Sequence, residues 1–135
     1  MTLYNDIIIR SFVRGCMAKP HVLVLGGNFA GLGSAQQIRK YAGDAVDITL
    51  IDRKNYLLYI PNIPAEVFEN RDPEETLRME LPPILAKDDI QFIQGDITAL
   101  DVARRTVQYV PSERPGSETQ TISYDYIVVA VGARL

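Results

Sequence analysis

The stretch "HVLVLGGNFAGLGSAQQIRKYAGDAVDITLIDRKNY", residues 21–56, predicts the fold of the chain. Within it, "VLVLG" is a continuous apolar run that ends at Gly26, which is typical of a strand buried on both faces of a parallel sheet. "FAGLGSAQQIRKYAG" has apolar residues at helical spacing and stops at Gly43, and "VDITLID" is a second strand that ends at Asp52. We therefore predict a right-handed βαβ unit over residues 22–52.

The turn after the first strand follows the spacing G-x-G-x-x-G, with Asn28 in place of the middle glycine. In this pattern the first glycine allows a tight turn and the last allows close helix packing, while the free N–H groups of the helix N-terminus bind a pyrophosphate. Asparagine tolerates a left-handed backbone, and its amide would either crowd the phosphates or donate a hydrogen bond to them. The candidate pyrophosphate-binding residues are Gly26, Gly27, Asn28, Phe29, Ala30 and Gly31.

Asp52 ends the second strand, 21 positions after Gly31 (52 − 31 = 21), where a carboxylate accepts hydrogen bonds from ribose hydroxyls. An acid at this position repels a 2′-phosphate, which favours FAD or NAD over NADP. Arg53 beside it argues against this preference, because an arginine can accommodate that phosphate. The alternative is a Rossmann-like domain that binds no nucleotide.

The remaining segments predict a parallel sheet with a small β-meander. Prolines 61 and 64 forbid a long helix and predict a loop over 53–68 that can include one helical turn, and Pro82 and Pro83 split or kink a helix that begins at Pro73. "IQFIQG" predicts a third strand, two short strands flank a turn at 103–105, and "TQTISY" adds another. "YDYIVVAVGARL" predicts a last buried parallel strand, closed by Gly132. The predicted fold class is an α/β Rossmann-like FAD/NAD(P)-binding domain, incomplete at its C-terminus.

Composition narrows the possible functions. The 135 residues carry a net charge of -3, one cysteine (Cys16) and one histidine (His21). No basic stripe for nucleic acid, internal disulfide or metal-ligand cluster is predicted, and the apolar runs are too short to cross a bilayer. We expect a single domain over 20–135 in a reducing, cytoplasmic environment, preceded by a leader or misassigned start over 1–19, with Met17 as the other possible start. His21 is predicted to lie on the surface.

Four segments together, "VLVLGGNFAGLGSA", "ITLIDRKNYLLYIPNIP", "IQFIQGDITALD" and "YDYIVVAVGARL", resemble the N-terminal FAD-binding part of the pyridine nucleotide-disulfide oxidoreductase superfamily. Within this superfamily of flavoproteins with two dinucleotide-binding domains, the chain looks most like sulfide:quinone oxidoreductases, flavocytochrome c sulfide dehydrogenases and type II NADH dehydrogenases. The resemblance covers residues 20–135.

The resemblance implies FAD as cofactor and a role for each matching residue. Gly26 to Gly31 would hold the pyrophosphate, Asp52 the adenosine ribose with Arg53 nearby, and the backbone of Ile97 the adenine. The A-V-G run at Ala130, Val131 and Gly132 matches the second fingerprint, in which Val131 replaces a threonine. Pro61 would contact the flavin, although Tyr56, Leu57 and Tyr59 of the same loop are also explained as residues that cap the sheet.

In that family the redox cysteines, the second Rossmann domain, a late Gly-Asp and the membrane-docking helices lie beyond residue 135. We therefore predict no catalytic residue and an FAD-binding N-terminal portion too short for complete catalysis; sulfide or NADH would donate electrons to a quinone only in an intact relative. The alternatives are a noncatalytic dinucleotide-binding module or split-protein subunit, or the N-terminal piece of a type II NADH:quinone dehydrogenase. The expected macromolecular partners are a second copy of the chain or a complementing C-terminal chain.

Overall fold

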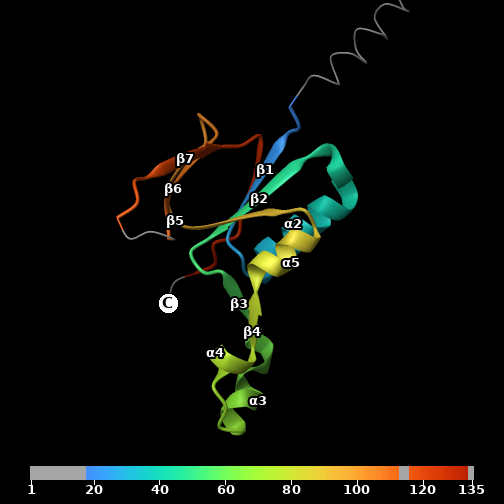
Figure 1. Ribbon diagram of the computed structural model, residues 1–135, viewed down its shortest axis with the longest axis vertical. Helices are drawn as coiled ribbons and strands as arrows, with labels where there is room; N and C mark the ends of the chain where they lie inside the picture. Colours follow the sequence, from blue (N-terminus) through green and yellow to red (C-terminus); the bar gives the residue numbers. More distant parts are fainter. Residues whose placement is uncertain (1–17, 113–115, 134–135) are drawn as a thin grey trace, which may run out of the picture.

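The computed structural model describes residues 18–112 and 116–133. A six-stranded sheet in the order β7-β6-β5-β2-β1-β8 forms the body of the molecule (Figure 1). Its parallel strands are β1 (His21–Leu25), β2 (Asp47–Asp52), the first part of β5 (Gln91–Asp101) and β8 (Tyr126–Val129). The antiparallel strands β6 (Thr106–Pro111) and β7 (Gln120–Ser123) complete it. The predicted α/β Rossmann-like fold with a β-meander is confirmed.

The predicted βαβ unit is present. Helix α2 (Phe29–Ala42) links β1 to β2, which pair in parallel, and it ends at Gly43, whose φ of 54° is left-handed. A short 3-10 turn, η1 (Gly43–Ala45), leads into β2. The C-terminal glycine therefore acts as the sequence predicts, because a residue without a side chain adopts this conformation at little cost.

The core lies on both faces of β1. Val22 and Val24 pack on the face covered by α2 and by α5 (Leu81–Lys87), whereas Leu23 and Leu25 pack on the opposite face with Val107 of β6. Leu23 and Val24 are completely buried. Alternate residues of a strand point to opposite faces, so a continuous apolar run needs cover on both sides. The curled meander supplies the second cover.

Residues 56–80 project from the sheet as an arm (Figure 1). The arm contains β3 (Tyr56–Leu58), η2 (Ile60–Asn62), α3 (Ile63–Phe68), α4 (Pro73–Thr76) and β4 (Arg78–Glu80), and β3 pairs antiparallel with β4. The prediction of a loop over 53–68 and of a single split helix after Pro73 is thus partly wrong. Prolines occupy the first turns of η2, α3, α4 and α5, where the missing N–H is harmless, so they start helices instead of kinking one.

A buried carboxylate fixes the arm internally. Glu66 is 3% exposed; it accepts hydrogen bonds from Arg71 Nε at 2.8 Å and from Thr76 Oγ1 at 2.7 Å. A weaker contact joins Asn62 Nδ2 to Glu66 Oε1 at 3.4 Å. These partners tie α3 to α4 across the turn between them. The arm is therefore held by a polar network where it has little apolar core of its own.

Two strand predictions need correction. The predicted third strand and the first meander strand are one strand, β5, which bends at an irregularity between Ile97 and Ala99 and passes from β2 to β6. Strand β8 is not buried on both faces: it lies at the sheet edge, and Tyr126 and Val129 are 63% and 57% exposed.

His21 lies partly exposed at the start of β1, which agrees with its predicted surface position. Its Nδ1 lies 2.8 Å from Ser123 O and its Nε2 lies 2.8 Å from Thr49 Oγ1, so the ring joins β1 to the end of β7 and to β2.

Candidate functional site

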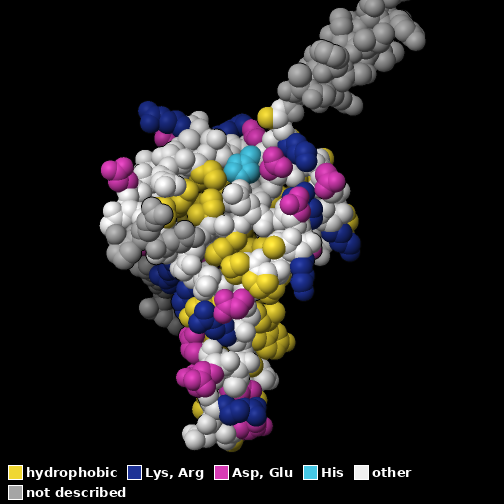
Figure 2. Space-filling model, viewed as in Figure 1, with side chains coloured by type: hydrophobic (Ala, Val, Ile, Leu, Met, Phe, Trp, Pro, Cys, Tyr) yellow, Lys and Arg dark blue, Asp and Glu magenta, His cyan; other side chains and the backbone are white. Residues whose placement is uncertain are grey.

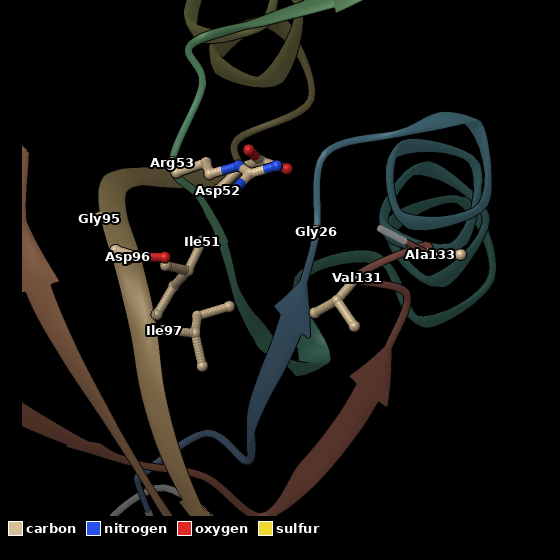
Figure 3. Close-up of a pocket in the computed structure, with 9 residues that line it drawn as sticks. All are labelled: Gly26, Ile51, Asp52, Arg53, Gly95, Asp96, Ile97, Val131 and Ala133. Carbon is tan, nitrogen blue, oxygen red and sulfur yellow. The ribbon is translucent and has the colours of Figure 1, made fainter. Parts of the chain in front are cut away.

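A cavity of about 310 Å³ opens where the carboxyl ends of β1, β2 and β8 meet β5 (Figure 3). Ligands of open α/β sheets bind at such an edge. The cavity is lined by Gly26, Ile51, Asp52, Arg53, Gly95, Asp96, Ile97, Val131 and Ala133. Five of the residues singled out from the sequence are in this set: Gly26, Asp52, Arg53, Ile97 and Val131. Segments more than 100 residues apart in the sequence thus meet at one site.

The glycines of the turn are required by close packing. Gly26 has a φ of 103°, and a Cβ atom there would overlap the carbonyl of Ala130. A Cβ atom on Gly31 would overlap the carbonyl of Gly26. A Cβ atom on Gly27 would lie 2.5 Å from Leu81 Cδ1 in the core. The chain therefore passes through this turn with no room for side chains at these three positions.

Asp52 holds the glycine turn as well as lining the cavity. Gly27 N donates to Asp52 Oδ2 at 2.6 Å, and Lys54 N donates to Asp52 Oδ1 at 2.8 Å. Each carboxylate oxygen has a further lone pair, so these bonds leave acceptor sites for ribose hydroxyls. The sequence pattern predicted the position of Asp52 but not its bond to Gly27.

Asn28 is engaged at both ends of its amide. It is the N-cap of α2, with Oδ1 accepting from Gly31 N at 3.0 Å and Nδ2 donating to Ala130 O at 2.8 Å. Its φ is -78°, so the left-handed conformation that the sequence suggested is not used. Within the described part of the chain, the N–H groups of Phe29 and Ala30 have no protein partner. These two donors at the start of a 14-residue helix suit a phosphate.

The predicted flavin-contact loop lies beside the glycine turn but outside the cavity lining. Phe29 and Tyr59 form an edge-to-face pair with ring centroids 5.9 Å apart, and both are 46% exposed. Pro61 follows in η2 and is exposed. Leu57 is buried in the core, and Tyr56 lies under the guanidinium of Arg78, with 4.0 Å from Arg78 Cζ to the ring centroid. Of the A-V-G run, Val131 lines the cavity, whereas its neighbours Ala130 and Gly132 are outside the lining.

The sequence did not single out four lining residues: Ile51, Gly95, Asp96 and Ala133. Asp96 is the second carboxylate of the site and is exposed, as the "QGD" triplet at the bend of β5 would have indicated. A Cβ atom on Gly95 would lie 2.8 Å from the Tyr109 ring. Packing across the sheet, not a local motif, explains that glycine.

Other kinds of site are not found in the part of the chain that the structure describes. Within residues 18–112 and 116–133, no group of three or more His, Cys, Asp or Glu side chains is placed to hold a metal ion. Across the same residues, no helix is long and apolar enough to cross a bilayer. Cys16 and residues 1–17 of the predicted leader over 1–19 lie outside the described residues.

The chain belongs to the pyridine nucleotide-disulphide oxidoreductase family, whose model matches residues 20–135. It is 33% identical over 119 residues to the sulfide-quinone reductase of Aquifex aeolicus, covering 88% of this chain and 25% of that protein. The solved structure of that enzyme superposes with a TM-score of 0.72 at 32% identity, over 87% of this chain and 25% of the other. The match lies in the N-terminal part of the superfamily's chains.

Two further relatives show the breadth of the family. Oxidoreductase ptaL of Pestalotiopsis fici is 28% identical over 84% of this chain and 32% of its own length. The external alternative NADH-ubiquinone oxidoreductase of Yarrowia lipolytica mitochondria is 29% identical over 86% of this chain and 20% of its own length. The chain therefore spans from a fifth to about a third of these relatives. Sulfide-quinone reductases and type II NADH dehydrogenases are FAD-dependent flavoproteins of this superfamily.

Proposed function

We propose that residues 20–135 bind the ADP half of FAD and form the N-terminal part of a flavin-dependent oxidoreductase of the sulfide:quinone reductase type. The observation that carries the proposal is the cavity in which the glycine turn, Asp52 and the A-V-G segment meet. The lining offers a carboxylate for the ribose and apolar walls for the base. The free N–H groups of Phe29 and Ala30, which lie outside that lining at the start of α2, would bind the phosphates.

Several predicted residues, together with Ile51 and Asp96, take specific parts in this proposal. Phe29 N and Ala30 N donate to the pyrophosphate, and the close packing of Gly26 and Gly31 lets the phosphates approach the helix. Asp52 accepts from the ribose hydroxyls, and Ile51, Ile97 and Val131 form the apolar walls. With Asp96 at the rim, two carboxylates face the cavity, which disfavours an additional 2′-phosphate. The bound flavin would supply the two-electron redox chemistry of the parent enzyme.

The residues that line the cavity contact only the nucleotide half of FAD in this assignment. Electron donor, electron acceptor and redox thiols belong to the remaining length of the relatives, so catalysis needs that part as well. Sulfide as the donor is favoured by the 33% identity to sulfide-quinone reductase. NADH as the donor is the second candidate, because an NADH-ubiquinone oxidoreductase matches at 29% identity. A module that binds FAD without catalysing a reaction is the alternative for the chain by itself.

The test is a calorimetric titration of the purified chain with FAD, with NAD in a parallel cell. We expect saturable binding of FAD, and we expect ADP to compete with it because both present the same half to the site. FMN lacks the adenosine half and serves as the matched control, which should not compete. A folded chain that binds neither FAD nor ADP, or that prefers FMN, would contradict the proposal.

A further inference from the structure

The Asn28 side chain joins two segments of the nucleotide site that lie 102 positions apart in the sequence. We propose that Asn28 is a positioning residue, a latch that holds the end of β8 against the first turn of α2 and fixes the shape of the site before a ligand binds. The inference rests on the proposed function for its consequence, FAD affinity, but the latch itself is a property of the ligand-free protein.

The segment after β8 leaves the sheet at Ala130, where few contacts hold it. Ala130 N donates to Leu25 O at 2.8 Å, which is the last contact of this segment with β1, and Gly132 then turns away with a φ of 71°. Among the described strands, β8 has β1 as its single neighbour in the sheet. The bond from Asn28 Nδ2 to Ala130 O, 2.8 Å long, therefore fixes the segment at the point where it leaves the sheet to line the cavity.

The carbonyl that Asn28 binds is closely packed against the glycine turn. A Cβ atom on Gly26 would overlap the Ala130 carbonyl, whereas a Cβ atom on Gly132 would only touch Asn28 Nδ2, at 3.4 Å. The other end of the amide satisfies Gly31 N at 3.0 Å, which leaves the N–H groups of Phe29 and Ala30 for an anion. A glycine at position 28 would provide neither bond. The latch thus orders both fingerprints in advance, which reduces the ordering cost of binding.

Two variants separate the latch from the helix cap. In N28D the shape and the acceptor for Gly31 N are kept, but the ionised carboxylate cannot donate to Ala130 O. In N28S the hydroxyl still caps α2 but is too short to reach Ala130. Amide exchange in the ligand-free protein is measured at Ala130, with Asp125 at the opposite end of β8 as the control amide, because Asp125 N donates to His21 O at 2.9 Å.

We expect exchange at Ala130 to become about 3- to 10-fold faster in both variants, the factor that corresponds to one lost hydrogen bond, with exchange at Asp125 unchanged. The carboxyl group introduced by N28D accepts from Gly31 N at the start of α2, which holds its pKa below the ordinary value of about 3.9, so it can donate again only in more acidic medium where it is protonated. The ratio of variant to wild-type exchange at Ala130 should then fall toward one in N28D but not in N28S. Unchanged exchange at Ala130 in both variants at neutral pH would overturn the latch.

FAD titrations of the same proteins test the consequence separately. We expect N28S to weaken FAD binding by about 3- to 10-fold, in line with the loss of one ordering contact. If the exchange result holds but N28S binds FAD as the wild type does, the positioning role in binding is overturned. If the wild type binds no FAD while the exchange result holds, the proposed function fails and the latch between β8 and α2 is supported.

Discussion

Gly31 and Gly33 stand two residues apart on α2, but a methyl group would meet different surroundings at each. At Gly31 the added Cβ would overlap the Gly26 carbonyl, whereas at Gly33 nothing lies within 4 Å. We expect Gly31→Ala to lower the free energy of unfolding by about 1–3 kcal/mol through overpacking and to reduce nucleotide binding. Gly33→Ala, the matched control, should raise stability by about 1 kcal/mol because alanine is the better helix former. Urea denaturation measures the free energy of unfolding of both variants. An equal change in the two would contradict the packing argument.

The Asp52 carboxylate has two roles, one in holding the glycine turn and one proposed in binding the ribose. Asp52→Ala removes the acceptor of Gly27 N and of Lys54 N, 2.6 and 2.8 Å away, and the proposed acceptor of the ribose. The expected result is a loss of about 1–3 kcal/mol in both the free energy of unfolding and the FAD binding free energy. Thermal unfolding and calorimetric titration are the two measurements.

Asp96 is the stability control for Asp52, since it places a second carboxylate at the same cavity but is exposed. Asp96→Ala should leave the free energy of unfolding within about 0.5 kcal/mol of the wild type, as exposed substitutions usually do. If the two alanine variants lost the same stability, the cause would be the loss of charge at the cavity and not the loss of the hydrogen bonds from Gly27 N and Lys54 N.

Local pattern singled out residues that the structure brings to one cavity, but it did not predict the partners of their side chains. The spacing of Gly26, Gly31 and Asp52 follows from backbone requirements that recur in every such turn, so it can be read from the sequence. The role of Asn28 cannot, because its partner Ala130 is brought near only by the pairing of β8 with β1. The bond from Gly27 N to Asp52 forms across the ends of β1 and β2, and the spacing of the pattern does not record it.

At the scale of elements, the arm depends on the ionised form of Glu66. The hydrogen bond from Arg71, followed by that from Thr76, lowers the pKa of Glu66 below its ordinary value of 4.5. A carboxyl group with a lowered folded pKa stabilises the folded arm above its ordinary pKa, and the effect is lost as the pH falls below 4.5 toward the folded value. We therefore expect the Arg71 amide, which donates to Glu66 O at 2.9 Å, to lose protection as the medium becomes acidic: it should exchange faster relative to its intrinsic rate, compared with the β1–β2 amides.

The Glu66→Gln variant should show the fast exchange at neutral pH and little further change on acidification. Glu69→Gln is the control, because Glu69 also pairs with Arg71 but its side chain is 57% exposed, against 4% for Glu66. Exposed pairs contribute little to stability. If amide exchange in the wild-type arm, compared with that of the β1–β2 amides, does not respond to pH, then ionised Glu66 does not stabilise the arm.

The elements also differ in how well the sequence predicts them. β1, α2 and β2 agree with prediction because a buried strand, an amphipathic helix and its glycine cap each have a local signature. The arm was missed since β3 and β4 are three residues long, and their pairing joins Tyr56 to Glu80 across two helices. The apolar run of β8 predicted a strand correctly, but its exposure depends on neighbours that no local pattern records.

On the scale of the whole molecule, the described residues leave apolar surface around the site uncovered. Figure 2 shows hydrophobic side chains gathered over the middle of one face and along the arm, with acidic and basic side chains interspersed. The exposed large apolar residues include Phe29, Tyr59, Ile60, Phe68, Tyr126, Val129 and Val131. Several of these border the cavity or the edge strand. Contiguous apolar surface of this kind marks a site of association.

Within residues 18–112 and 116–133, no strand pairs with the outer edge of β8, and "YIVV" carries no charge or proline to discourage pairing. We expect the 135-residue chain to self-associate through this edge, giving a sedimentation coefficient that rises with concentration. Val129→Lys places a charge on the edge at a side chain 57% exposed and should restore the monomer. Tyr41→Lys removes an apolar side chain that is 80% exposed on α2, away from the edge, and should not. If Tyr41→Lys restored the monomer equally, general surface hydrophobicity would explain the association, and a wild type that is monomeric at every concentration would exclude pairing through β8.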